Sequence, residues 1–151
     1  GDWLALFLDT SQQPGRSDGR LSKEELSRLE RTLAVSGQRH VMLFLHHPPV
    51  QIGSRWMDSM GLTNAEALFA ITDRFPQVKG MVFGHMHQQF EGSRNKVRMI
   101  GSPSTCIQFK PGADAFEADA LPPAYRWFDL RPDGTFETGV RYVHAQLRQA
   151  V

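Results

Sequence analysis

The sequence has one cysteine, no long hydrophobic run and no excess of charge of either sign. The single Cys106 excludes an internal disulfide framework and suits a reducing compartment, so we expect a cytoplasmic protein. The longest apolar stretch, around 41–45, has the length of a strand rather than of a membrane span. With 17 Lys and Arg against 16 Asp and Glu, and no basic run, we expect no binding to nucleic acid or to a membrane.

The length of 151 residues and the hydrophobic content of 40% fit one domain with its own core. The chain begins Gly1-Asp2-Trp3, without an initiator Met or a leader signal, and enters an apolar segment at once. We therefore expect 1–151 to be a single-domain fragment of a longer protein. We expect it to contain a strand-and-helix part (1–87), a mainly β part (88–143) and a polar tail (144–151).

Three apolar runs, at 3–8, 40–45 and 78–83, alternate with two segments of helical spacing. Each run is apolar at nearly every position, which is typical of strands that are covered on both faces. The order strand, helix, strand, helix, strand is the pattern of right-handed crossovers. We therefore predict an α/β fold with a mainly parallel sheet in this part of the chain.

The starts of the two helices carry local signals. Ser22 followed by Glu25 has the spacing of a capping box, and Thr63 followed by Glu66 has the same spacing. The second helix should stop before Pro76, because the residue that precedes a proline disfavours the helical conformation. These signals predict two helices, each capped by a hydroxyl side chain.

Helical spacing disappears after residue 88. Short strand-like pieces follow, with a turn expected at 92–95 and a linker at 110–123. The segments 125–130 and 135–143 predict a closing β-hairpin, because a turn sequence separates them.

Histidines stand where two of the predicted strands end. His46 follows the second apolar run, and His85 and His87 follow the third. The carboxyl ends of neighbouring parallel strands lie about 4.8 Å apart at one edge of a sheet, where ligands bind. We therefore expect the three imidazoles in one metal-binding cavity. Gly84, which has no Cβ, should let the backbone turn sharply and approach a ligand.

Five further residues have both a functional and a structural interpretation. His47 is a substrate contact, the donor of a hydrogen bond behind the metal, or a structural residue. Asp9 is a candidate metal ligand, although capping of its own loop is the simpler expectation. Cys106 is expected to be a buried small residue rather than a nucleophile. Trp56 and Met57 either line a pocket or pack in the core.

Three stretches together resemble a known family. They are Leu45-His46-His47-Pro48-Pro49, Gly84-His85-Met86-His87-Gln88 and Ser102-Pro103-Ser104-Thr105-Cys106-Ile107-Gln108-Phe109. With them the sequence resembles the calcineurin-like metallophosphoesterases, and more narrowly the bacterial class III phosphodiesterases that hydrolyse cyclic AMP. The resemblance implies the C-terminal half of a four-layer α/β/β/α sandwich with mixed sheets.

The resemblance also assigns site residues. His46 and His85 are expected to bind one metal ion of a pair, and His87 the other. The pair is expected to be Fe, Mn or Zn. The motifs that the family carries in its first half, among them Asp-x-His and Gly-Asn-His, have no match in this sequence. This chain alone is therefore expected to have a partial or empty site and to be inactive.

The implied function of the intact protein is metal-dependent hydrolysis of cyclic AMP to 5′-AMP. One alternative is another phosphoesterase of the superfamily, acting on a 2′,3′-cyclic nucleotide, a glycerophosphodiester or a nucleotide. The other is a non-catalytic module whose histidines bind one metal or none. The expected partner is a cyclic nucleotide or another small phosphodiester. We also expect self-association, as a homo-oligomer, through the apolar surface that the absent half would cover.

Overall fold

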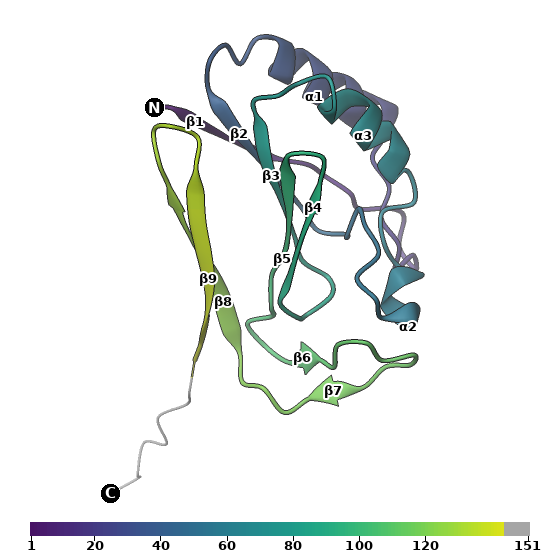
Figure 1. Cartoon of the computed structure of the whole chain (residues 1–151). Helices are drawn as coiled ribbons and strands as arrows, with labels where there is room; N and C mark the ends of the chain where they lie inside the picture. Colours follow the sequence, from purple (N-terminus) through teal and green to yellow (C-terminus); the bar gives the residue numbers. More distant parts are fainter. Residues whose placement is uncertain (144–151) are drawn as a thin grey trace, which may run out of the picture.

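The computed structural model describes residues 1–143, and a five-stranded mixed sheet forms its centre (Figure 1). The elements, in chain order, are β1 (Trp3–Phe7), α1 (Lys23–Ala34), β2 (His40–Leu45), α2 (Arg55–Asp58), α3 (Ala65–Thr72), β3 (Val78–Phe83), β4 (Phe90–Arg94), β5 (Val97–Gly101), β6 (Gln108–Phe109), β7 (Ala118–Asp119), β8 (Ala124–Leu130) and β9 (Phe136–Tyr142). The predicted tail at 144–151 lies outside the described residues. No helix within residues 1–143 has the length and apolarity needed to cross a membrane.

The strands of the central sheet lie in the order β1-β2-β3-β5-β4. β1, β2, β3 and β5 run parallel, and β4 runs antiparallel beside β5. The predicted alternation of strands and helices and the mainly parallel sheet are confirmed. Leu45 pairs with Phe83, so β2 and β3 end side by side at the same edge of the sheet.

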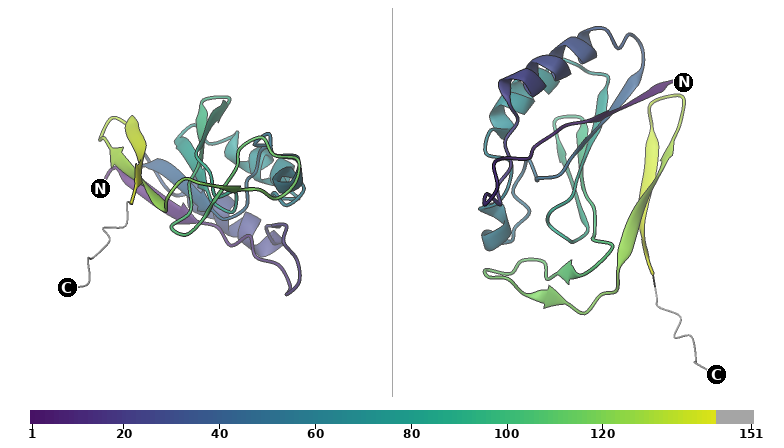
Figure 2. Two further views of the ribbon diagram at one scale, coloured as in Figure 1. Left: turned by 90° about the horizontal axis from the view of Figure 1, so that it is seen from below. Right: turned by 180° about the vertical axis from the view of Figure 1, so that it is seen from behind.

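The strands alternate between two apolar cores, because successive side chains of a strand point to opposite faces. Val41 and Leu43 of β2 face the helices, whereas Met42 faces the other way and joins a second core with Phe136 of β9. Figure 2 shows the helices and the β8–β9 hairpin on opposite sides of the sheet. The expectation of strands covered on both faces is therefore met for β2 and β3.

β1 departs from that expectation. It is the edge strand, and only Leu6 and its helix-facing neighbour Leu4 belong to the main core. On the opposite face Ala5 is exposed, and the Phe7 ring is 68% exposed although it stacks on Phe44 at 4.9 Å. Coverage on both faces is therefore not found for β1 within the described residues, because the hairpin covers only part of this face.

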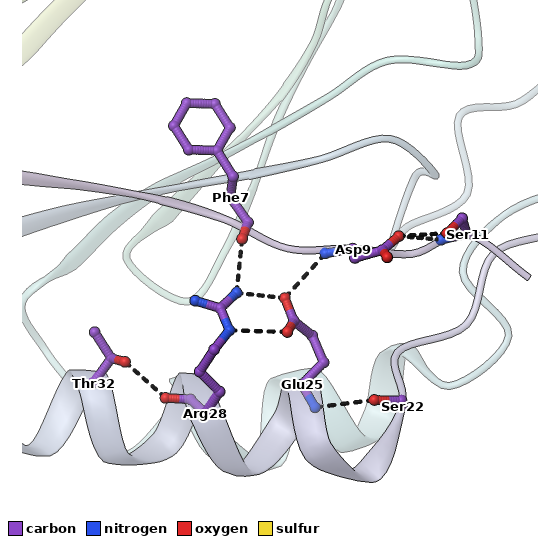
Figure 3. Close-up of polar contacts among 7 residues, drawn as sticks. All are labelled: Phe7, Asp9, Ser11, Ser22, Glu25, Arg28 and Thr32. Carbon is purple, nitrogen blue, oxygen red and sulfur yellow. Dashed lines mark hydrogen bonds and ion pairs between the residues drawn. The ribbon is translucent and has the colours of Figure 1, made fainter.

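The start of α1 is tied to the end of β1 (Figure 3). The Ser22 hydroxyl accepts a hydrogen bond from the Glu25 backbone N–H at 3.0 Å, so the predicted N-cap is confirmed. The Glu25 carboxylate does not return to Ser22. It accepts from the Asp9 backbone N–H at 3.0 Å and from Arg28 Nε at 2.9 Å, and Arg28 also donates to the Phe7 carbonyl at 2.8 Å. This network fixes where the loop after β1 begins.

The second predicted cap is wrong. α3 is preceded by Asn64, whose side chain bridges the backbone N–H and carbonyl of Leu21 at 3.0 and 2.9 Å. The Thr63 hydroxyl donates to the Gly19 carbonyl at 2.9 Å instead of capping the helix. Both side chains hold the loop after β1 against the start of α3. Tertiary partners have therefore replaced the local capping box.

The C-terminal β part follows the prediction except at one turn. β4 continues through Arg94, and the chain reverses at Asn95, whose φ of 54° is left-handed. The expected turn at 92–95 is thus placed too early, because Asn tolerates the left-handed conformation that a two-residue hairpin loop requires. The closing hairpin is confirmed as β8–β9, and the expected linker contains the short strand β7.

Replacement of Ser22 by Ala should lower the free energy of unfolding by about 1 kcal/mol, because the N-terminal N–H groups of α1 lose their side-chain acceptor. Urea denaturation measures the loss. Ser27→Ala is the matched control, since Ser27 is an exposed position inside the same helix. It should change the stability by less than about 0.5 kcal/mol. Equal losses in the two variants would contradict the cap.

Candidate metal centre

Three histidines from two loops meet at the carboxyl edge of the sheet. Ring nitrogens of His46, His47 and His85 all lie within 4.8 Å of one another. His46 Nε2 is 3.0 Å from His85 Nδ1. The Gly84 backbone N–H donates to the His46 carbonyl at 3.0 Å, so the register of β2 and β3 continues past the last strand residues. The topology thus places His46 and His85 side by side.

The spacing of these nitrogens fits one transition-metal ion. Two nitrogens about 2.0–2.1 Å from the same ion, at angles near 90–110°, lie about 2.9–3.4 Å apart. The observed 3.0 Å falls in this range. In addition, His85 Nε2 is buried and has no hydrogen-bond partner among the described residues. With Nδ1 facing the ion, Nε2 would carry the ring proton, and the backbone of Ser17 lies close enough to this ring to raise its pKa.

The electrostatics of the cluster favour neutral rings. Burial, together with the neighbouring His47, His46 and His87, lowers the pKa of His85 to about 4. Burial also lowers the pKa of His46, with a smaller contribution from His87. Neutral imidazoles keep the lone pair that a metal ion requires. The cluster is therefore in the protonation state of a ligand set near neutral pH.

His87 lies beside the cluster rather than in it. Its Nδ1 is 3.1 Å from the Ile107 carbonyl, and its ring stacks on Phe109 at 4.2 Å and 10°. A carbonyl oxygen only accepts, so Nδ1 carries the proton and Nε2 keeps its lone pair. A backbone carbonyl behind the ring is a common arrangement for metal-bound histidine. The structure does not bring His87 within the group formed by His46, His47 and His85.

The backbone at the carboxyl edge of the sheet is strained at two of the histidines. His85 has a φ of 66° and His87 a φ of 47°. Non-glycine residues with left-handed φ are uncommon and cluster at functional sites. Gly84 was expected to provide the sharp turn, but its φ is not left-handed, and an added Cβ would meet His46 Nδ1 at an ordinary 3.6 Å. That expectation is wrong.

The remaining predicted residues lie outside the cluster. Asp9 accepts from the backbone N–H and the hydroxyl of Ser11 at 2.9 and 2.6 Å, which lowers its pKa, so it caps its own loop. Cys106 is exposed, so the prediction of a buried residue is wrong. The reason is that it stands in a loop bend held by Ser104. Met57 is buried in the core.

Sequence reasoning missed the residues that hold the histidine rings. Thr10 Oγ1 lies 2.8 Å from His47 Nδ1, and Gly19 lies against the same ring. Phe109 stacks on His87, and Trp56, for which the sequence predicts either a pocket-lining or a packing role, lies against Phe109 with ring centroids 5.2 Å apart. Thr10 could have been found, because it follows the carboxyl end of β1 at the same sheet edge. The other contacts depend on loop conformations that carry no local signal.

Histidine protonation should make the stability of the metal-free chain fall as the pH drops from about 6.5 to about 4. Below pH 6.5 the His85 side chain is protonated in the unfolded chain but stays neutral in the folded chain. Acid therefore favours unfolding until the pH reaches the pKa of the folded state. Urea midpoints measured across this range in the presence of a chelator report the loss. His85→Gln should flatten the curve, whereas His40→Gln, at the other end of β2, should keep its slope.

Several curated proteins are similar to this chain in sequence. It is 43% identical over 143 residues to the 3′,5′-cyclic adenosine monophosphate phosphodiesterase CpdA of Pseudomonas aeruginosa, covering 95% of this chain and 52% of that protein. It is 42% identical to the protein of the same name from Escherichia coli K12, covering 91% of this chain and 50% of the other. A 3′,5′-cyclic-nucleotide phosphodiesterase of Nostoc is 38% identical, with coverage of 95% and 53%.

Solved structures share the fold. A dimetal phosphatase from Danio rerio superposes with a TM-score of 0.53 at 23% identity, covering 72% of this chain and 34% of that one. The GAP50 protein of Plasmodium superposes with a TM-score of 0.56 at 19% identity, covering 78% and 39%. No family model matches the chain. The chain spans about half the length of the curated relatives it matches. Over that half the chain is similar in sequence to bacterial cyclic AMP phosphodiesterases, and it shares its fold with a dimetal phosphatase.

Proposed function

We propose that this chain supplies one side of the metal centre of a phosphodiesterase that hydrolyses cyclic AMP to 5′-AMP. The observation that carries the proposal is the approach of His46 Nε2 to His85 Nδ1 at 3.0 Å, at the carboxyl edge of the sheet. The names of the relatives specify the substrate class.

In this proposal His46 and His85 hold one ion and His87 Nε2 holds the second. A pair of divalent ions, when bound, lowers the pKa of water toward neutrality and stabilises charge on the leaving 3′-oxygen. The chain itself orients the ligands. The Ile107 carbonyl keeps the proton of His87 on Nδ1, and the Gly84 N–H fixes the backbone of His46. Imidazole nitrogen suits Fe, Mn or Zn, and the proposal does not depend on which is used.

The proposal requires further ligands. Within the described residues the cluster contains histidines and no carboxylate. Two-metal sites usually need carboxylates to bridge the ions and balance their charge. The curated relatives are about twice as long as the matched segment, so we expect the missing ligands in the half that this chain does not match. We also keep the cytoplasm as the proposed compartment, because the only cysteine is a free, exposed thiol.

A substrate panel separates cyclic AMP from the alternative phosphoesters. The panel consists of 3′,5′-cyclic AMP, a 2′,3′-cyclic nucleotide, a glycerophosphodiester and a nucleotide monoester. The proposal expects the highest kcat/KM for 3′,5′-cyclic AMP. A higher kcat/KM for another substrate of the panel would replace cyclic AMP with that substrate in the proposed function. No turnover with any metal would favour the non-catalytic module.

His46→Ala and His85→Ala should each lower phosphodiesterase turnover by about 100-fold or more in the full-length protein, because each removes a nitrogen from the first ion. Isothermal titration of the chain with Zn²⁺ or Mn²⁺ should show a parallel loss of affinity, which reports on the ligands without any assay of activity. His40→Ala is the matched control, since His40 lies at the start of β2, away from the cluster. Wild-type turnover in His85→Ala would rule out the assignment.

Self-association is a further proposal, supported by the apolar face beside β1. Phe7 is 68% exposed on the face of β1 opposite the helices. Sedimentation of the chain should therefore depend on its concentration, and Phe7→Lys should reduce association. Val35→Lys is the control, because Val35 is 79% exposed at the end of α1, on the helix side of the sheet. A monomer at all concentrations would contradict this prediction.

A further inference from the structure

His47 has a different environment from the two histidines beside it. Its side chain is buried, with 8% exposed, and Thr10, which is 2% exposed, faces its Nδ1 at 2.8 Å. His46 and His85, by contrast, face each other through ring nitrogens and have no hydroxyl partner among the described residues. Within the described residues Nδ1 of His47 has a hydroxyl partner, and the backbone of Ser17 also lies close enough to the ring to raise its pKa.

The chemistry of the Thr10 contact decides where the His47 proton lies. Within residues 1–143 the Thr10 hydroxyl has no hydrogen-bond partner besides His47 Nδ1. If Nδ1 carried the proton, the hydroxyl would accept, and its own proton would be buried without an acceptor, which is unfavourable. The satisfied arrangement has the Thr10 hydroxyl donating to Nδ1. A neutral imidazole that accepts at Nδ1 carries its proton on Nε2.

This tautomer is the opposite of the one at His87. There the Ile107 carbonyl keeps the proton on Nδ1 and leaves a lone pair on Nε2. A metal ion requires a lone pair, whereas an anionic oxygen requires an N–H donor. The two residues behind the rings, a hydroxyl and a carbonyl, therefore prepare the two histidines for different partners.

The loop after β1 holds His47 in place. The Thr10 carbonyl accepts from the Arg20 N–H at 3.0 Å, and the Gly19 N–H donates to the Gly61 carbonyl at 3.0 Å. The backbone of Gly19 then approaches the imidazole so closely that an added Cβ would lie 2.4 Å from Nδ1. A ring enclosed in this way has little room to rotate about its Cβ–Cγ bond. The ring is thereby held beside the rings of His46 and His85, with centroid distances of 4.9 and 4.7 Å.

We infer that His47 is not a metal ligand but an N–H donor to a phosphoryl oxygen of the substrate, and that Thr10 is the positioning residue that sets its tautomer. The inference rests on the proposed phosphodiesterase function for the identity of the acceptor. In this arrangement His46 and His85 present lone pairs to an ion, and a ring nitrogen of His47 lies within 4.8 Å of theirs. A phosphate anion at this edge can therefore meet a cation and a hydrogen-bond donor at once.

The first test measures the tautomer in the chain itself, without metal. Two-bond ¹H–¹⁵N correlation spectra assign the protonated nitrogen of each histidine. We expect Nε2–H at His47 in the wild type and in Thr10→Ser, which keeps the hydroxyl. Thr10→Val has nearly the same shape but no hydroxyl, so it should lose the single tautomer. A wild-type His47 protonated on Nδ1, or a tautomer unaffected by Thr10→Val, would overturn the inference.

The second test measures metal affinity. Titration with Zn²⁺ should give a dissociation constant for His47→Gln within about 2-fold of the wild type, because Gln retains an N–H donor and removes no ligand. His46→Ala should weaken binding by about 10-fold or more. Equal losses in His47→Gln and His46→Ala would make His47 a ligand and overturn the inference.

The third test measures turnover in the full-length protein. Thr10→Val should lower kcat for cyclic AMP by about 10-fold with little change in KM, and Thr10→Ser should restore it. Unchanged kcat in Thr10→Val would overturn the role of Thr10. Complete lack of turnover in the wild type would instead reject the phosphodiesterase assignment, while the spectra and the Zn²⁺ titrations would still decide between donor and ligand at His47.

Discussion

The candidate site depends on the parallel pairing of β2 with β3. Leu45 pairs with Phe83, and one more hydrogen bond, from the Gly84 N–H to the His46 carbonyl, extends the pairing beyond the strands. This contact fixes the separation of two loops that are far apart in sequence. A shift of the register by one residue would turn His46 to the other face of the sheet. The 3.0 Å approach of the two imidazoles follows from this pairing.

A second constraint is the choice of atom behind each ring. The Ile107 carbonyl and the Thr10 hydroxyl lie at equivalent nitrogens of His87 and His47, yet they favour opposite tautomers. Burial keeps the rings neutral, which makes the choice of tautomer decisive for what each ring can bind. His85 and His87 both have left-handed φ values, so the folded chain holds a strained backbone at the two positions that orient these side chains. Four similar residues can thus carry out different tasks in one small region.

The two faces of the central sheet are covered to different extents. One face of the sheet is closed by α1 and α3, and the other is covered in part by the β8–β9 hairpin (Figure 2). The hairpin protects Met42 and Val82 but leaves Phe7 exposed. Within residues 1–143 the histidine cluster holds no carboxylate, and this chain spans about half the length of its curated relatives.

The sequence by itself determined the strand order along the chain, the capped start of α1 and the three histidines that follow β2 and β3. These features depend on local patterns, namely apolar runs, a hydroxyl three residues before a glutamate, and residues placed where a strand ends. Tertiary structure decided the rest. Asn64 rather than Thr63 precedes α3, with its side chain hydrogen-bonded to the backbone of Leu21, and β1 is an edge strand because it pairs with β2 alone among the described strands. The tautomers of His47 and His87 were also decided in this way, since the atoms that set them come from loops that only the folded chain brings to the rings.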